Sequence, residues 1–317
     1  MNNMAYDEFP KEQPQQQPQQ HIGNENEVGN GVHANGTSVP KGRKFDDVWH
    51  RKISNTSSFV AVSKFLGEFF GTATLMFLGC MGCLDAFGNE TSNLSRGLIF
   101  GFTVMVVILT FGVVSGAHIN PVVSIAAYIY GDLSFVMVLA YSVAQFSGAL
   151  CGYGLLMGVA PQKYFDQALV DGHGSCVTAP HDSLSTGAAL AIEFIVTGIL
   201  IWACCGVWDP RNAQHQDSVP VKFALLVAAI SVAGGPATGA SMNPARTLAP
   251  CVWNNSYHKI WIYFVGPPLA GVIMPIIYKC LFRREVTNEN ILETPPPVQE
   301  PVCVCIVHNK ESQFEKV

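Results

Sequence analysis

The chain has 317 residues, and 13% of them are Asp, Glu, Lys or Arg, where roughly 25% is usual in a soluble protein. Apolar residues make up 49% of the chain, and its formal net charge is −5. The acidic balance excludes a basic nucleic-acid-binding protein, so no nucleic acid is expected as a partner. The shortage of charge argues against a soluble enzyme of ordinary surface.

Charged residues are concentrated at the two ends of the chain, and none occurs between Arg96 and Asp132. This distribution is typical of a protein whose solvent is lipid. Residues 1–57 and 283–317 are polar, with a Gln- and Pro-rich run in the first segment and three consecutive prolines in the second. Such segments cannot bury enough apolar area to offset the entropy of ordering, so both are predicted to be disordered tails.

Between the tails, six apolar stretches of about 20 residues are each long enough to cross a bilayer. They cover residues 60–84, 97–116, 134–158, 187–208, 219–236 and 259–281. Buried helices of a large soluble core are the alternative, and the scarcity of charge between the stretches argues against it. The prediction is an all-α integral membrane protein with one membrane domain over residues 58–282.

Lys and Arg flank the six spans unequally, and this bias predicts their orientation. Five lie between residues 41 and 52 and three between 279 and 284, whereas one face carries only Arg96, Lys163 and Lys259. Both termini are therefore expected in the cytoplasm, with the plasma membrane as the expected location. The loop at 85–96 is then external, where the sequons at Asn89 and Asn93 are candidate glycosylation sites.

The chain contains an internal repeat, and its two copies each carry an Asn-Pro pair. Segment 115–122 (SGAHINPV) matches segment 238–245 (TGASMNPA), with Gly, Ala, Asn and Pro in the same register. A second mark supports the match, because Glu68 precedes the first Asn by 52 residues and Glu193 precedes the second by 50.

Each half of the repeat, about 58–158 and 187–282, contains three spans and one Asn-Pro element. Three crossings are an odd number, so the second half enters the membrane from the opposite face. The two halves are therefore predicted to form an inverted repeat related by an axis in the membrane plane.

Asn is a strong N-cap and Pro is favoured at the first helical position, so each Asn-Pro pair predicts a helix start. The apolar runs that follow, 122–130 and 245–253, have nine residues each. Nine residues rise about 14 Å, roughly half the hydrocarbon thickness, so each run must re-enter rather than span. Inversion of the halves brings the two helix starts together at mid-depth.

A capping Asn accepts a backbone N–H bond through its side-chain oxygen, so its NH2 group is left as a donor towards the cavity. A water molecule between Asn120 and Asn243 must present its oxygen to both donors, which interrupts a proton-conducting chain of waters. The positive helix ends repel cations. The site therefore suits neutral, hydrogen-bonding solutes, and no nucleophile–base pair, cofactor motif or metal-ligand pattern points to an enzyme.

These paired motifs, with Asn243-Pro-Ala-Arg246 in the second, resemble the aquaporin or major intrinsic protein family over residues 60–282. In aquaporins, positive helix ends and a pore Arg are known barriers to protons and cations. The resemblance implies six tilted helices and two re-entrant half-helices, one pore per protomer, and a homotetramer in the lipid bilayer. It makes residues 58–282 the channel domain.

The resemblance also implies the roles of particular residues. The pore motifs are Asn120, Pro121, Val122, Asn243, Pro244 and Ala245. The selectivity filter is Phe100, Ser231, Ala240 and Arg246. Glu68 and Glu193 are buried braces that accept hydrogen bonds from the re-entrant loops. Val122 is larger than the usual Ala and is expected to narrow the middle of the pore.

Some positions depart from the pattern of water-selective relatives, which usually carry His where Ser231 stands and often Cys where Ala240 stands. A wider, less polar ring favours glycerol and urea beside water. Thr247, however, replaces the Asp usual in glycerol facilitators, and Tyr263-Phe264 resembles the water-channel branch. This mixture is similar to the insect entomoglyceroporins.

Three alternatives remain open at this point. One is a water-selective channel of the same fold. Another is an ion-coupled secondary transporter, for which Glu68 and Glu193 are the candidate ion sites. The third is a junction or signalling membrane protein with a residual pore. His118, beside the first motif, is interpreted as a structural histidine, with pH sensing as its alternative.

Most of the ten cysteines are expected to be small apolar thiols in or beside the spans, because no metal or redox motif accompanies them. This group is Cys80, Cys83, Cys151, Cys204, Cys205 and Cys280. Cys176 and Cys251 have no assignable partner. Cys303 and Cys305 are candidate palmitoylation sites on composition.

Overall fold

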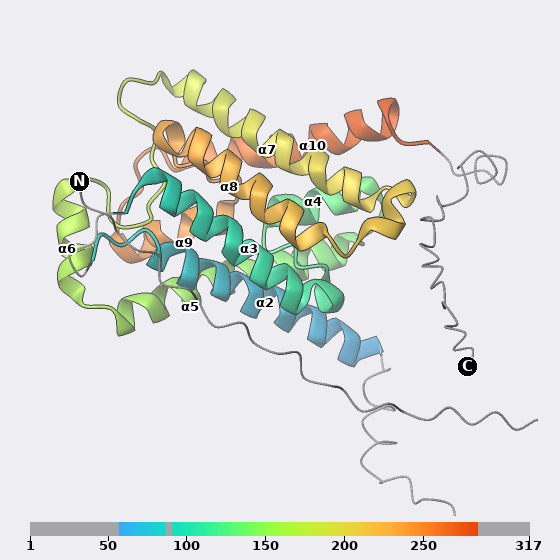
Figure 1. Cartoon of the computed structure of the whole chain (residues 1–317), viewed down its shortest axis with the longest axis horizontal. Coiled ribbons are helices and arrows are strands. Elements are labelled where there is room, and N and C mark those ends of the chain that lie inside the picture. The colour runs from blue at the N-terminus through green and yellow to red at the C-terminus, as the bar shows by residue number, and fades with distance from the viewer. Residues whose placement is uncertain (1–56, 87–90, 285–317) are drawn as a thin grey trace, which may run out of the picture. The chain divides into compact units, whose positions relative to one another are not determined.

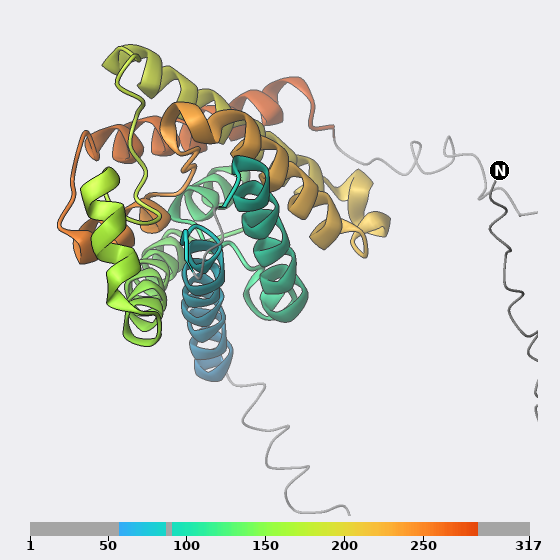
Figure 2. The same ribbon diagram turned by 60° about the vertical axis from the view of Figure 1, so that its left-hand side comes forward.

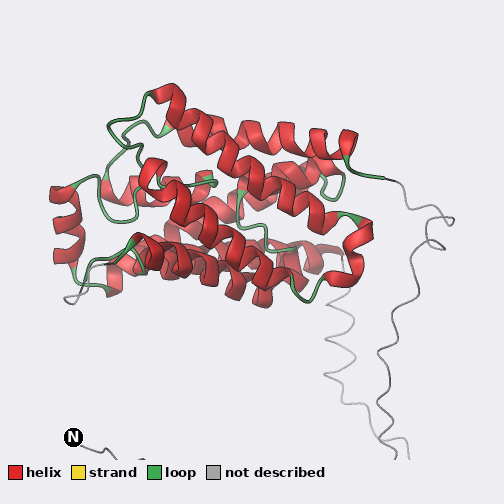
Figure 3. Cartoon of the chain, turned by 45° about the horizontal axis from the view of Figure 1, so that its top comes forward, coloured by secondary structure: helices red, strands yellow, loops and turns green. Residues whose placement is uncertain are grey.

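A computed structural model describes residues 57–86 and 91–284, and the regular elements of these residues are helices. Figure 3 shows them in red, joined by short loops. Three predicted features lie outside the described residues: the disordered tails apart from residues 57, 283 and 284, the sequon at Asn89, and the candidate palmitoylation sites Cys303 and Cys305.

Six helices are long and apolar enough to cross a membrane, as predicted. They are α2 (Ser57–Met81), α3 (Asn93–Ser115), α5 (Phe135–Val159), α7 (Thr186–Trp208), α8 (Val219–Thr238) and α10 (Trp261–Leu281). The largest difference from a predicted bound is at α3, which begins at Asn93 rather than at residue 97. Its first turn is polar and is stabilised by Ser92, whose hydroxyl accepts the N–H of Ser95 as an N-cap.

Two short helices begin at the Asn-Pro pairs, α4 (Pro121–Tyr130) and α9 (Pro244–Asn254). At 1.5 Å per residue each is about 15 Å long, which is half a membrane crossing. Two further elements were not predicted: α6 (Gln162–Asp171) and the 3-10 helix η1 (Pro210–His215). Both are short and carry charged residues, so an analysis based on apolar runs does not detect them.

The two ends of the bundle are named here by their elements. The terminal face is the end where α2 begins and α10 ends, at the right of Figure 1, and the loop face is the opposite end, where α6 lies. The half-helix α4 runs from the interior towards the terminal face, and Arg283 at that face donates to the carbonyl of Tyr130 at its end. The half-helix α9 runs the other way, towards the loop face.

Packing follows the inverted repeat. Within the halves, α2 packs on α5 and α7 packs on α10, and α3 packs on α8 where the halves meet. Each half-helix also lies against the last helix of the other half, α4 on α10 and α9 on α5. Figure 2 shows α3 between α2 and α8 in a turned view. The two halves of the repeat thus exchange their half-helices in the packing.

Glycines allow the closest of these helix contacts. A Cβ added at Gly101 in α3 would lie 2.2 Å from the carbonyl oxygen of Ala224 in α8. One added at Gly148 or Gly152 in α5 would lie 2.3 or 2.2 Å from a backbone oxygen of α2. Only glycine therefore fits at these positions, as expected where helices associate through small residues.

The outward faces of the spans are apolar. Val113 is 93% exposed, and Leu109 and Leu225 are each 62% exposed. Apolar side chains in such numbers are not left in water by a soluble protein, so the bundle surface fits a lipid environment.

Candidate functional site

The two re-entrant loops leave their helices at glycines in the left-handed region, Gly116 with φ 87° and Gly239 with φ 83°. The first and third residues after each glycine also have positive φ: Ala117 (47°) and Ile119 (45°), and Ala240 (42°) and Met242 (54°). This conformation costs energy for residues with a Cβ, so the surrounding structure must hold both loops.

Glu68 of α2 holds the first loop from the interior of the bundle. Its Oε1 accepts the Ser115 hydroxyl at 2.7 Å and the His118 N–H at 2.9 Å. Its Oε2 accepts the Ile119 N–H at 2.6 Å and the side-chain amide of Gln145 at 2.8 Å. The side chain is fully buried, and its acceptor sites are directed to the loop and to α5.

Glu193 of α7 repeats this arrangement in the second half. Its Oε1 accepts the Thr238 hydroxyl at 2.7 Å and the Ser241 N–H at 3.0 Å. Its Oε2 accepts the Met242 N–H at 3.1 Å. It is also fully buried, and neither Glu lines the cavities described below.

Two tyrosines complete the support of the loops, a role that was not predicted from the sequence. The Tyr141 hydroxyl of α5 donates to the carbonyl of Ser115 at 2.7 Å, and the Tyr263 hydroxyl of α10 donates to that of Thr238 at 2.6 Å. They follow those residues by 26 and 25 positions. This near-identical spacing in the repeat was the signal that could have found them.

The two capping asparagines connect the loops to each other. Asn120 Oδ1 accepts the Val122 N–H at 2.9 Å, and Asn243 Oδ1 accepts the Ala245 N–H at 3.0 Å. Asn120 Nδ2 donates to the carbonyl of Met242 at 2.9 Å, and Asn243 Nδ2 donates to that of Ile119 at 2.8 Å. Because each NH2 group has two hydrogens, one N–H per Asn remains for the cavity.

A cavity of about 140 Å³ extends from the side of the terminal face past the Asn pair to Arg246. Asn120, Asn243 and His118 line it together with apolar side chains of α3, α7 and α8. The His118 ring lies edge-on to Tyr141, with 5.3 Å between ring centroids, and its Nδ1 is 3.2 Å from the Ser124 hydroxyl. His118 thus has packing and hydrogen-bond partners as well as a place at the cavity wall.

A second cavity, of about 530 Å³, lies on the side of the loop face. It shares three lining residues with the first: Phe100, Ser231 and Arg246. The passage between the two cavities therefore lies at these three side chains. They come from three elements, α3, α8 and α9.

Two other residues expected at the pore, Ala240 and Val122, do not line these cavities. Ala240 is buried and lines neither cavity. It packs against Gly234, where an added Cβ would lie 3.2 Å from the Cβ of Ala240. Val122 is fully buried against Gly271 of α10 and lines neither cavity, so it does not narrow the pore as expected. The next residue, Val123, lines the first cavity instead.

Arg246 is held at the passage by the loop that follows α6. Its Nη1 donates to the carbonyl of Cys176 at 2.6 Å, and its Nη2 is 3.6 Å from the sulfur of the same residue. The guanidinium carbon lies 5.0 Å from the ring centroid of Phe100, a cation–π contact. The side chain is only 9% exposed.

Cys176 forms a disulfide with Cys80 at the end of α2. The interpretation of Cys80 as a free apolar thiol is therefore wrong, and Cys176 has a partner. The two residues are 96 positions apart and are brought together by the path of the loop after α6. That path follows no periodic pattern, so the sequence did not reveal the pair.

Charged and titratable groups line the loop-side cavity. Arg96 forms an ion pair with Asp85 at 2.9 Å. Burial alone would raise the pKa of Asp85, but hydrogen bonds from the Thr91 N–H and from Arg96 outweigh it and lower the pKa. Burial raises the pKa of the Cys83 thiol, which keeps it protonated. Asn93 also lines this cavity, and its amide donates to the carbonyl of Val232 at 2.7 Å, a bond that a glycan would have to replace.

Comparisons with known proteins agree with this architecture. A family model described as Major intrinsic protein matches residues 55–278. Aquaporin-8 of Mus musculus is 32% identical over 222 residues, which are 70% of this chain and 82% of that protein. The lens fiber major intrinsic protein of Gallus gallus is 31% identical over 257 residues, 79% of this chain and 94% of that protein.

A solved structure matches as well. The X-ray structure of the aquaglyceroporin from Plasmodium falciparum superimposes with a TM-score of 0.61 at 25% identity, over 70% of this chain and 96% of that one. The family match, the six apolar helices and the paired half-helices point to the same conclusion. The chain belongs to the major intrinsic protein family and is an integral membrane channel for water and small solutes rather than an enzyme.

Proposed function

We propose that this channel conducts glycerol and urea as well as water, and excludes protons and ions. The observation that carries the proposal is the passage at Phe100, Ser231 and Arg246, where the two cavities share their lining. Ser231 presents a small hydroxyl group at this point, so the passage has room for a carbon skeleton. The likeness to an aquaglyceroporin structure supports the same reading.

Selection among solutes at the passage would combine hydrogen bonds from the Arg246 guanidinium with apolar contact on the Phe100 ring. Arg246 directs Nη1 and Nη2 to the oxygen and the sulfur of Cys176, so other N–H groups among its five remain to donate to a solute oxygen. The Phe100 ring offers the apolar surface against which the carbons of glycerol can lie. Deeper in the pore, the second N–H of Asn120 and of Asn243 would take the oxygen of each permeant in turn.

Exclusion of charge would follow from the same groups. The N-terminal ends of α4 and α9 carry partial positive charge at mid-depth, and the Arg246 guanidinium stands before them. A cation would meet these charges without a free carboxylate beside it, because Glu68 and Glu193 face the loops and not the cavities. Asp85, which lines the loop-side cavity, is paired with Arg96. This placement weighs against an ion-coupled transporter, which needs an ion site on the path.

We further propose that the loop face is external and both termini are cytoplasmic. The excess of Lys and Arg near the terminal face supports this orientation. The Cys80–Cys176 disulfide lies at the loop face, and disulfides persist in oxidising compartments. A homotetramer in the plasma membrane, with one pore per protomer, is part of the same proposal.

The test is the swelling of proteoliposomes under water, glycerol and urea gradients, with native protein and with Ser231→His. The imidazole adds bulk and a donor at the passage, so glycerol and urea flux should fall by about tenfold or more, a barrier change of roughly 1.4 kcal/mol, while water flux stays within about twofold. Ala240→Ser is the matched control, because that residue lines neither cavity.

Each other outcome favours a different reading. Water flux without solute flux in the native protein would favour a water-selective channel. Flux that saturates and depends on an ion gradient would favour a transporter. No permeability at all would favour a junction or signalling protein.

A further inference from the structure

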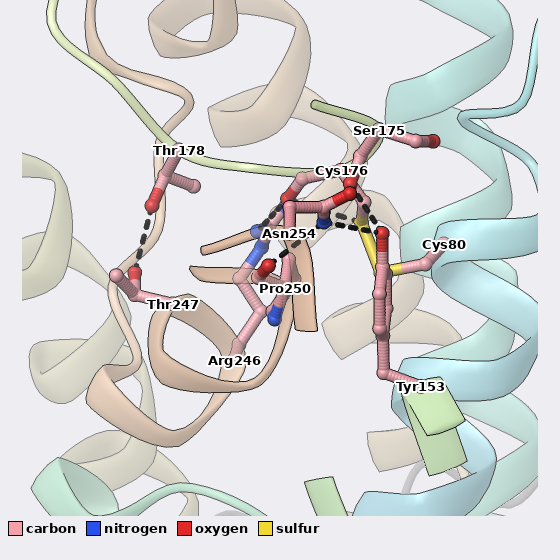
Figure 4. The surroundings of a disulfide bond; sticks show 9 residues. All are labelled: Cys80, Tyr153, Ser175, Cys176, Thr178, Arg246, Thr247, Pro250 and Asn254. Carbon is pink, nitrogen blue, oxygen red and sulfur yellow. Dashed lines mark hydrogen bonds between the residues drawn. A yellow bond between two sulfur atoms is a disulfide. The ribbon is translucent and has the colours of Figure 1, made fainter. Parts of the chain in front are cut away.

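The loop after α6 crosses the loop-side mouth of the pore as a strap, defined here as residues 174–178. Figure 4 shows its surroundings, with Cys176 at its centre next to Arg246 and Cys80. The Tyr153 hydroxyl of α5 donates to the carbonyl of Ser175 at 2.7 Å. At the other end, the hydroxyls of Thr178 and Thr247 lie 2.9 Å apart. The strap is thus fixed on both sides of Cys176.

The side chain of Arg246 depends on this strap for its polar contacts. In the described residues, the ion pairs involve Arg96 and Arg211 and not Arg246. The recorded partners of its guanidinium are the oxygen and the sulfur of Cys176, together with the Phe100 ring. An arginine side chain has about 2 kcal/mol of rotamer entropy, so Arg246 keeps a single rotamer only where a hydrogen-bond acceptor holds its guanidinium.

The carbonyl of Cys176 is aimed by an unusual backbone. Cys176 has φ 63°, in the left-handed region that residues with a Cβ rarely adopt. Such a conformation persists only where the surroundings hold it. Here the covalent bond to Cys80, which is fully buried in α2, fixes the side chain of Cys176 to a membrane-spanning helix.

We propose that the Cys80–Cys176 disulfide determines solute selectivity by positioning Arg246 at the passage. The cross-link holds the Cys176 carbonyl, the carbonyl holds the guanidinium, and the guanidinium sets the width left beside Phe100 and Ser231. Cys80 and Cys176 are positioning residues, since they act on the solute through Arg246. This inference rests on the proposed function, because it concerns which neutral solutes pass.

Loss of the cross-link should loosen the filter without closing the channel. The strap would keep its Tyr153 and Thr247 contacts, but Cys176 could relax from its left-handed backbone and withdraw its carbonyl. Arg246 would then lose an acceptor and sample more positions. Discrimination against a solute larger than glycerol should fall, whereas water, which needs the least width, should continue to pass.

The experiment measures the permeability ratio of erythritol to glycerol, with water permeability, in proteoliposomes. It compares native protein, Cys80→Ser/Cys176→Ser, and native protein after reconstitution and treatment with a dithiol. The dithiol reduces the disulfide to two thiols and becomes a disulfide itself, and mass spectrometry counts the new thiols. Cys151→Ser is the control, because Cys151 is an exposed free thiol of α5.

The erythritol-to-glycerol ratio should rise by about tenfold in the double variant and on reduction, the change expected from losing one hydrogen bond to a charged group. Cys151→Ser should behave as native protein in both states. In an Arg246→Ala background, removal of the disulfide should add nothing to the ratio, since the two changes act through one contact.

The outcomes separate the two proposals. If native protein conducts no water or glycerol, the proposed function fails. If it conducts both and the ratio is unchanged after verified loss of the disulfide, the positioning role is wrong. An equal rise in the Arg246→Ala background would also overturn it, because the cross-link would then act elsewhere. If the double variant does not fold, the reduced native protein supplies the comparison.

Discussion

At the scale of single residues, each re-entrant loop depends on one carboxylate. Glu68 accepts four hydrogen bonds and Glu193 accepts three, and both sets include two backbone N–H groups of a loop with positive φ. Their matched distance from the Asn-Pro pairs was visible in the sequence. The role of the two tyrosines was not predicted, because one Tyr in an apolar span has no distinguishing context until the two halves of the repeat are aligned.

The unequal bond counts lead to a prediction for Glu68→Gln and Glu193→Gln. In each variant the amide replaces one oxygen, and donors that met that oxygen lose their acceptor. At Glu68 each oxygen accepts from two donors, whereas at Glu193 the amide can take the place of Oε2, which accepts from one donor only. Each buried donor left unpaired costs about 1–3 kcal/mol. Thermal unfolding in detergent should therefore show a larger loss of stability for Glu68→Gln.

A matched control is Asp166→Asn, an exposed change from carboxylate to amide in α6 whose remaining oxygen can still accept from Gln162. It should leave the unfolding temperature close to that of native protein. Equal unfolding temperatures for native protein and both Glu→Gln variants would show that the carboxylates do not hold the loops.

At the scale of elements, the six spans and the two half-helices could be predicted because each has a physical signal of its own. Apolar length identifies a span, and an Asn cap followed by Pro identifies a helix start. The start of α3 lay outside the prediction because its first turn is polar and its Ser92 cap is a local contact. The helix α6 lay outside it because a short element with charged residues resembles a loop.

The closest helix contacts give a prediction at this scale. Gly148→Ala and Gly101→Ala each place a Cβ within 2.3 Å of a backbone oxygen, so α2 and α5, or α3 and α8, must move apart. Overpacking of this kind costs about 1–3 kcal/mol, and a lower unfolding temperature in detergent should report it.

Gly158→Ala, also in α5, is the matched control, because nothing lies within 4 Å of its added Cβ. Its unfolding temperature should equal or slightly exceed that of native protein, since Ala favours the helix by about 0.5–1 kcal/mol. If all three variants unfold together with native protein, close backbone approach does not stabilise the bundle.

At the scale of the whole molecule, the inverted repeat explains why the pore has two sets of equivalent parts. The loops, their carboxylates, their tyrosines and the exchanged half-helices all occur twice, and the two Asn side chains bond across the centre. The repeat in the sequence predicted the paired loops, carboxylates and half-helices, but not the tyrosines or the bonds from each Asn to the opposite loop. The departures from symmetry were not predictable: the strap and its disulfide belong to the loop face alone and depend on contacts 96 positions apart.

The same symmetry determines what the centre of the pore does to water. Two half-helices meet there with their N-terminal ends, and each Asn keeps one N–H for the cavity. A water that accepts from both cannot accept a proton from its neighbour in the file. Water should pass while the proton path is interrupted.

The most direct test measures water and proton flux in the same proteoliposomes, with an osmotic gradient followed by light scattering and a pH gradient followed by an internal dye. Protein-free liposomes and liposomes with a proton ionophore set the two limits. The arrangement predicts water flux that rises in proportion to reconstituted protein while proton flux stays at the protein-free level. Proton flux that rises with protein alongside water flux would contradict it.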